Sequence, residues 1–150
     1  MAYKFINEED LLTDIQPQFL KVIAQDDTTE ESSQEEKDAV QERKERAEAS
    51  AISKMSSVLS NRYDVGLVFN PSSTYGDKEL IIEYVCNLTR YRLWRSVNPR
   101  NVSQQVKDDY NEVMDWLDGV KENTTHPDLP TITAEDERRT DQAVWGGNNK

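Results

Sequence analysis

The stretch that decides the fold is LIIEYVCNLTRYRLW, residues 80–94. Ten of its fifteen residues are apolar or aromatic, and they fall on nearly every side of a helix with 3.6 residues per turn. A helix that is apolar all round is a buried one, so this segment predicts the central helix of a helical fold. Because Asp77 is a suitable N-cap and Asn98-Pro99 a suitable stop, we expect this helix at residues 78–97.

Further helical segments flank the central one in the sequence. Residues 35–62 carry apolar side chains at spacings of three, four or seven, which predicts one long helix with a buried C-terminal half. Residues 103–122 carry a stripe that alternates spacings of four and three. Residues 7–24 are expected to form two short helices separated at Pro17. The predicted fold class is therefore all-α, a small antiparallel helical bundle.

Two segments without helical periodicity complete the predicted architecture. Every second residue from Tyr63 to Phe69 is apolar and turn residues follow, which predicts a short extended loop or hairpin within residues 63–77. The apolar side of this segment either contacts another chain or packs on its own domain. Periodicity is lost after Asn123, so we expect a helical domain at 1–123 and an extended tail at 124–150.

Charge is distributed unevenly along a chain whose formal net charge is −11. The segment 26–46 is polar and strongly acidic, and the helix end that it contains is either solvated or an arm that needs a neighbour. Residues 78–100 hold five basic and two acidic side chains. Among them, Arg90, Arg92 and Arg95 either complement the dipole at a helix C-terminus and pair with local carboxylates, or form a docking patch for an acidic neighbour.

Composition excludes several classes of function. A single cysteine, Cys86, and a single histidine, His126, leave no disulfide framework and no Cys-rich zinc site. The five glycines do not assemble a phosphate-binding motif. The longest apolar run, residues 65–69, is far shorter than the roughly 20 residues of a membrane span. The acidic charge argues against general nucleic-acid binding. We expect binding or structural work, with no catalytic residue, cofactor or metal.

One large aromatic side chain lies beyond every predicted core element. Trp145 is followed by two glycines, which is typical of an anchor that inserts into a pocket of a partner protein. The alternative is a solvated chain end. The candidate partner-binding residues are Phe69, Arg90, Arg92, Arg95 and Trp145.

Three packing motifs occur in a fixed order. Residues 51–63 form a small-residue helix that ends in Leu-Ser-Asn-Arg-Tyr, residues 86–93 end in Arg-Tyr-Arg-Leu, and residues 106–119 contain the pair Trp116-Leu117. In this order and spacing, the sequence resembles small head–tail adaptor proteins of tailed phages, the Mu-like head–tail connection family. The sequence departs from the family in its more acidic segment 26–46 and its long tail.

The resemblance implies an α-helical subunit that is not an enzyme and that forms a ring of about twelve copies. Such a ring would dock beneath the portal protein, contact downstream tail or neck proteins, and continue the channel through which genomic DNA passes without specific binding. It implies a place in the virion neck, and in the host cytoplasm during assembly, with no membrane partner. The alternative is a soluble assembly factor or scaffold-like binding protein that is not retained in the virion.

Overall fold

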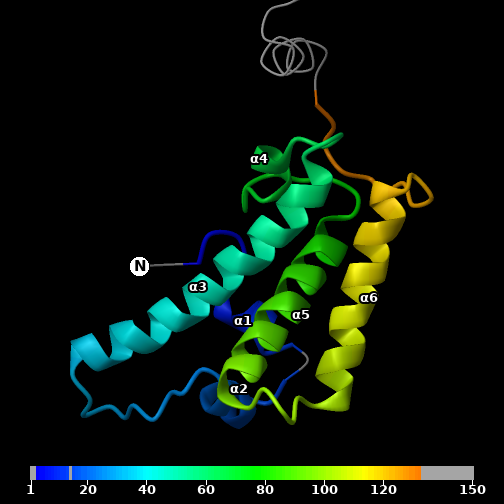
Figure 1. Ribbon diagram of the computed structural model, residues 1–150. Coiled ribbons are helices and arrows are strands. Elements are labelled where there is room, and N and C mark those ends of the chain that lie inside the picture. The colour runs from blue at the N-terminus through cyan, green and yellow to red at the C-terminus, as the bar shows by residue number, and fades with distance from the viewer. Residues whose placement is uncertain (1–2, 14, 133–150) are drawn as a thin grey trace, which may run out of the picture.

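The computed structural model describes residues 3–13 and 15–132. Within these ranges the chain forms the helices α1 (Glu8–Leu11), α2 (Pro17–Ile23), α3 (Gln34–Leu59), α4 (Val65–Val68), α5 (Lys78–Val97) and α6 (Gln104–Lys121). Figure 1 shows α3, α5 and α6 packed beside one another, with α4 and α2 at opposite ends of the bundle. The predicted all-α fold is confirmed.

Helix α5 is the centre of the bundle, as its apolar sequence predicts. It contacts α1, α2, α3 and α6, and its bounds are those expected from the sequence. Cys86 is buried in this core. Two aromatic pairs join α5 to α6. The Tyr91 and Tyr110 rings are stacked at 3.9 Å between centroids, and Tyr84 meets the edge of Trp116 at 5.3 Å.

Residues 65–68 form helix α4, so the predicted hairpin is wrong at this point. The reason lies in the preceding residue, since the Asp64 carboxylate accepts a hydrogen bond from the Leu67 N–H and caps the first turn. Val68 then packs in the core while Leu67 is 44% exposed. Tyr63 does pair as a β-residue, because it forms an isolated antiparallel bridge with Thr131.

Residues 126–132 form no helix and pack on the helical domain. Leu129 is only 5% exposed. The Asp64 N–H donates to the Pro130 carbonyl at 2.9 Å. The Asp128 N–H donates to Asp77 Oδ2 at 2.7 Å. The Asp77 carboxylate therefore binds the segment around Asp128 and makes no capping hydrogen bond to α5. Trp145 and the rest of the predicted tail lie outside the described residues.

A buried carboxylate fixes the N-terminal segment to α3. Glu48 is only 1% exposed and accepts three backbone hydrogen bonds, from the N–H groups of Lys4 (2.7 Å), Phe5 (2.7 Å) and Ile6 (2.9 Å). Buried polar groups of this kind need partners, and here each partner also relieves a backbone donor that has no helix or sheet to pair with. The buried carboxylate therefore packs the middle of α3 against residues 4–6.

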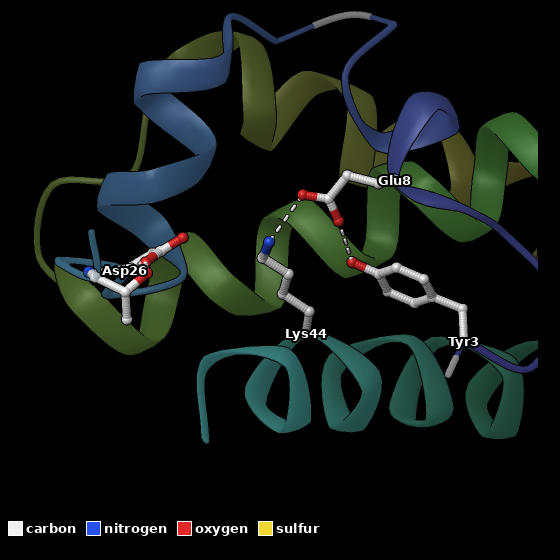
Figure 2. A network of polar contacts seen from close by, with 5 residues as sticks. Tyr3, Glu8, Asp26 and Lys44 are labelled. Carbon is white, nitrogen blue, oxygen red and sulfur yellow. Dashed lines mark hydrogen bonds and ion pairs between the residues drawn. The ribbon is translucent and has the colours of Figure 1, made fainter. Parts of the chain in front are cut away.

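A second network lies one helical turn earlier on α3. Figure 2 shows the Glu8 carboxylate between two side chains, accepting hydrogen bonds from Lys44 Nζ at 2.8 Å and from the Tyr3 hydroxyl at 2.7 Å. Burial raises the pKa of Tyr3, and the hydrogen bond to Glu8 raises it further. The two networks bind residues 3–8 to the middle of α3, so the short first helix has a fixed position.

Three tyrosines should make the domain sensitive to alkaline pH. Burial raises the pKa of Tyr75 and Tyr84 to about 12 from 10.0, and the pKa of Tyr3 rises also. A raised folded-state pKa gives stability that is complete below the unfolded value and lost as pH rises through the folded value. We therefore expect the free energy of unfolding to fall between about pH 10 and pH 12, measured by urea unfolding at successive pH values.

A single-residue variant checks the origin of this alkaline decline. The Tyr84 hydroxyl donates to Glu112 Oε2 at 3.1 Å and can ionise only by giving up that bond. Tyr84→Phe removes the ionisable group, so the decline between pH 10 and 12 should become shallower than in the wild type. Equal slopes in the two proteins would contradict the assignment.

Candidate partner-binding surfaces

The three arginines predicted as one patch point to different environments. Arg90 is 4% exposed, and its guanidinium donates to the Leu11 carbonyl at 3.0 Å and to Asn87 Oδ1 at 2.6 Å. It therefore links α1 to α5 inside the domain, in contrast to the predicted patch. Arg92 and Arg95 are exposed, and neither forms an ion pair within residues 3–13 and 15–132.

Two basic side chains of α3 lie beside these exposed arginines. Arg46 and Arg92 line a hollow of about 170 Å³ between α3 and α5. Lys54, Arg92 and Arg95 line an adjoining one of about 70 Å³. Because Arg92 borders both hollows, the surface is continuous. We call Arg46, Lys54, Arg92 and Arg95 the basic face.

Partners on the same domain hold parts of this surface in place. Lys54 Nζ donates to the Tyr110 hydroxyl at 3.3 Å and lies 5.5 Å from the centroid of that ring. Arg46 pairs with Glu42 on the exposed side of α3. Arg43 borders the same hollow, but its guanidinium donates to the Ala24 and Gln25 carbonyls at the end of α2. We therefore leave Arg43 out of the basic face.

Sequence reasoning missed Arg46 and Lys54. They precede Arg92 by about forty residues, and only the packing of α3 on α5 brings them together. Eight residues turn a side chain by about 80° on a helix, so their spacing by itself does not place the two on one face.

An apolar groove of about 360 Å³ lies between α2, α5 and the start of α6. Its apolar lining residues are Ile15, Phe19, Trp94 and Val106. Phe19 is 49% exposed, and Val22, one helical turn further on, is 59% exposed. Val97 lies one helical turn after Trp94 on α5 and is also exposed. Of the apolar residues that line the groove, Phe19 is the one that is exposed, and the polar residues Gln16, Arg90, Ser103, Gln105 and Asp109 complete the lining.

Phe69, the remaining predicted contact residue, is buried. Its ring meets the edge of the Phe5 ring at 5.6 Å between centroids, inside the core. Of the two alternatives for this segment, the structure therefore shows packing on its own domain.

The acidic segment begins with an exposed arm, a loop at residues 26–33 followed by the first residues of α3. Residues 26–38 hold seven acidic side chains and one basic one, a net charge of −6, and none of these residues is buried. We call them the acidic arm. Figure 1 shows α3 beginning at a corner of the molecule, away from α6. Burial alone would raise the pKa of Asp26, but hydrogen bonds from the Thr28 hydroxyl and N–H outweigh it and lower the pKa, so this carboxylate stays charged.

The described part of the chain contains no group of three or more His, Cys, Asp or Glu side chains placed to hold a metal ion. None of its helices is both long enough and apolar enough to cross a lipid bilayer.

The fold and its surfaces are those of a small helical protein with a basic face, an acidic arm and an apolar groove. A model of the bacteriophage Mu Gp36 family matches residues 5–144, and the chain belongs to that family. It is therefore a phage protein. No curated protein and no solved structure matches it.

Proposed function

We propose that this protein is a structural component of the virion that forms an adaptor ring between the portal and the tail. About twelve copies would surround the channel through which the genome leaves the head. In this role the protein catalyses no reaction and needs no cofactor. Its partners are further copies of itself, the portal protein and downstream neck or tail proteins, and it is present in the host cytoplasm only until assembly.

The proposal rests on the apolar groove, taken together with the phage family to which the chain belongs. Isolated exposed apolar side chains are ordinary, but a hollow of about 360 Å³ bordered by Phe19 and Trp94 is the kind of surface that a permanent contact covers. In a subunit of a larger particle, a neighbouring protein would cover this surface.

The net charge of −11 also suits a channel protein. DNA must slide past the wall of a connector, and a negatively charged wall repels phosphate groups where a basic wall would hold them.

Purified particles test the proposal directly. We expect the protein in tail-bearing virions, at the neck in electron micrographs. Phe19→Glu combined with Val22→Glu should leave the isolated domain folded, since both side chains are exposed, but should abolish incorporation into particles. Leu67→Glu, an equally exposed apolar position on α4, is the matched control and should be incorporated normally.

The same particles separate the alternative function. A soluble assembly factor would be required during infection but would be absent from finished virions. Absence of the protein from purified, infectious particles would therefore overturn the adaptor proposal and favour an assembly factor.

A further inference from the structure

We propose that the basic face is the docking site for the acidic arm of a second copy of this chain. The proposal rests on the proposed ring and deepens it, because it assigns the contact by which one subunit binds the next. It concerns four cations on one copy, Arg46, Lys54, Arg92 and Arg95, and the carboxylates of residues 26–38 on its neighbour.

The basic face is available for such a contact. Arg92 and Arg95 are exposed and have no carboxylate partner among the residues that the structure describes. Arg46 has only the pair with Glu42, whose exposed position makes it weak and easily exchanged. The hollows of about 170 and 70 Å³ beside these side chains give an incoming helix or loop room to approach.

The helical end of the acidic arm likewise forms no ion pair with the described residues of its own subunit, whereas Asp26 at the start of the arm interacts with Thr28, Lys44 and Lys21. The ion pairs of the described residues involve Glu8 and Glu42, and none uses a carboxylate of residues 26–38. Part of the arm is preformed, because the Ser33 side chain accepts a hydrogen bond from the Glu36 N–H and starts α3 there. Binding through this helical turn therefore costs little ordering of the chain.

The helical part of the arm, residues 34–38, lies away from the basic face of its own subunit. It belongs to the same continuous helix as Arg46, and ten residues separate Glu36 from Arg46. At a rise of about 1.5 Å per residue, that is about 15 Å along a rigid axis. The carboxylates of Glu35 and Glu36 are therefore placed to bind the basic face of another copy.

A contact of this kind has consequences for the assembly. The arm and the basic face are different patches of the same surface, so the contact is heterologous: each subunit offers its arm to one neighbour and its basic face to the other. Heterologous contacts repeat until the rotation closes a ring, or they continue as a filament. The observed placement of charge thus matches a cyclic assembly.

Duplex DNA is the other polyanion to consider as a ligand of the basic face. A DNA site needs several phosphates neutralised at once, whereas this face offers four cations on a chain whose net charge is −11. The observations therefore favour an acidic protein segment over DNA.

Charge reversal at exposed positions tests the contact. The face variant is Arg92→Glu with Arg95→Glu, and the arm variant is Glu35→Lys with Glu36→Lys. The control is Lys107→Glu with Lys121→Glu, which changes the net charge as much as the face variant does but lies on exposed positions of α6. Circular dichroism verifies that all of them stay folded, and sedimentation velocity measures self-association of the full chain.

We expect the wild type and the control to associate at about 50 mM salt and to dissociate as salt is raised, since screening weakens exposed charge pairs. Each charge-reversed variant alone should associate at least about tenfold more weakly. An equimolar mixture of the two should recover part of the association, because the unchanged arm of the face variant fits the unchanged face of the arm variant.

Several results would overturn the proposal. These are a wild type that stays monomeric at low salt, a face variant that associates like the wild type, and a mixture that does not recover. Retardation of duplex DNA by the wild type that the face variant loses would assign the face to DNA instead. Incorporation of the face variant into virions at the wild-type level would refute the contact while leaving the adaptor role intact, whereas absence of the wild type from virions would refute the adaptor role itself.

Discussion

Replacing Glu48 with alanine should lower the free energy of unfolding by about 3–5 kcal/mol. The carboxylate is buried and accepts hydrogen bonds from three backbone N–H groups, those of Lys4, Phe5 and Ile6. Hydrogen bonds to a charged acceptor contribute about 1.5–3 kcal/mol each, and a buried donor left without a partner costs about 1–3 kcal/mol. Because these contributions are not additive, the expected loss is smaller than their sum.

An exposed glutamate of the same helix provides the control for this experiment. Glu36→Ala makes the same substitution in the first turn of α3, where the loss of a favourable charge at the helix N-terminus should cost no more than about 1 kcal/mol. Urea unfolding gives both values, and amide hydrogen exchange of residues 4–6 should be faster in the Glu48 variant alone. Equal stability of the two variants would show that the buried carboxylate does not hold the N-terminal segment.

Leu117→Ala should cost about 2–5 kcal/mol, the range found when a buried leucine is truncated and its site relaxes only in part. Leu117 is 1% exposed and lies in the stripe of α6 that packs on the core. Leu67→Ala deletes the same atoms from a side chain that is 44% exposed and should cost far less. Thermal unfolding measures both, and a shift for Leu117→Ala no larger than for Leu67→Ala would remove this residue from the core.

The features that the sequence predicted correctly are set by local periodicity. The bounds of α5 follow from a segment that is apolar on all sides between two helix-terminating signals. The stripe of α6 is confirmed because a spacing of three and four residues repeats at the pitch of an α-helix, whatever the rest of the chain does. The expected start of the first short helix at residue 7 agrees with the structure, in which Asn7 caps α1 and forms a reciprocal bond with Asp10.

The features that the sequence did not predict depend on distant partners. Glu48 lies among charged helix formers and has the local pattern of a surface residue, since the N–H groups that bury it are more than forty positions away. The returning segment at Leu129 is likewise held by residues near Tyr63 and Asp77.

Helix geometry alone predicts that Arg90 and Arg92 lie on different sides of the helix. Two positions along a helix turn a side chain by about 200°, so these arginines face different sides, whereas Arg92 and Arg95 are only about 60° apart. Grouping them by nearness in sequence missed this difference. Whether an arginine on a given side is buried depends in addition on which helix packs there, and that is a property of the tertiary fold.

The binding of residues 4–6 by Glu48 also determines when the N-terminal segment can dock during synthesis. The N-terminal segment leaves the ribosome first, yet the carboxylate that binds it belongs to a residue made about forty positions later. Closing so long a loop is slow relative to forming a helical turn. The first residues to be made therefore wait for residue 48 before they can dock, and a nascent chain that ends before Glu48 has nothing to bind them.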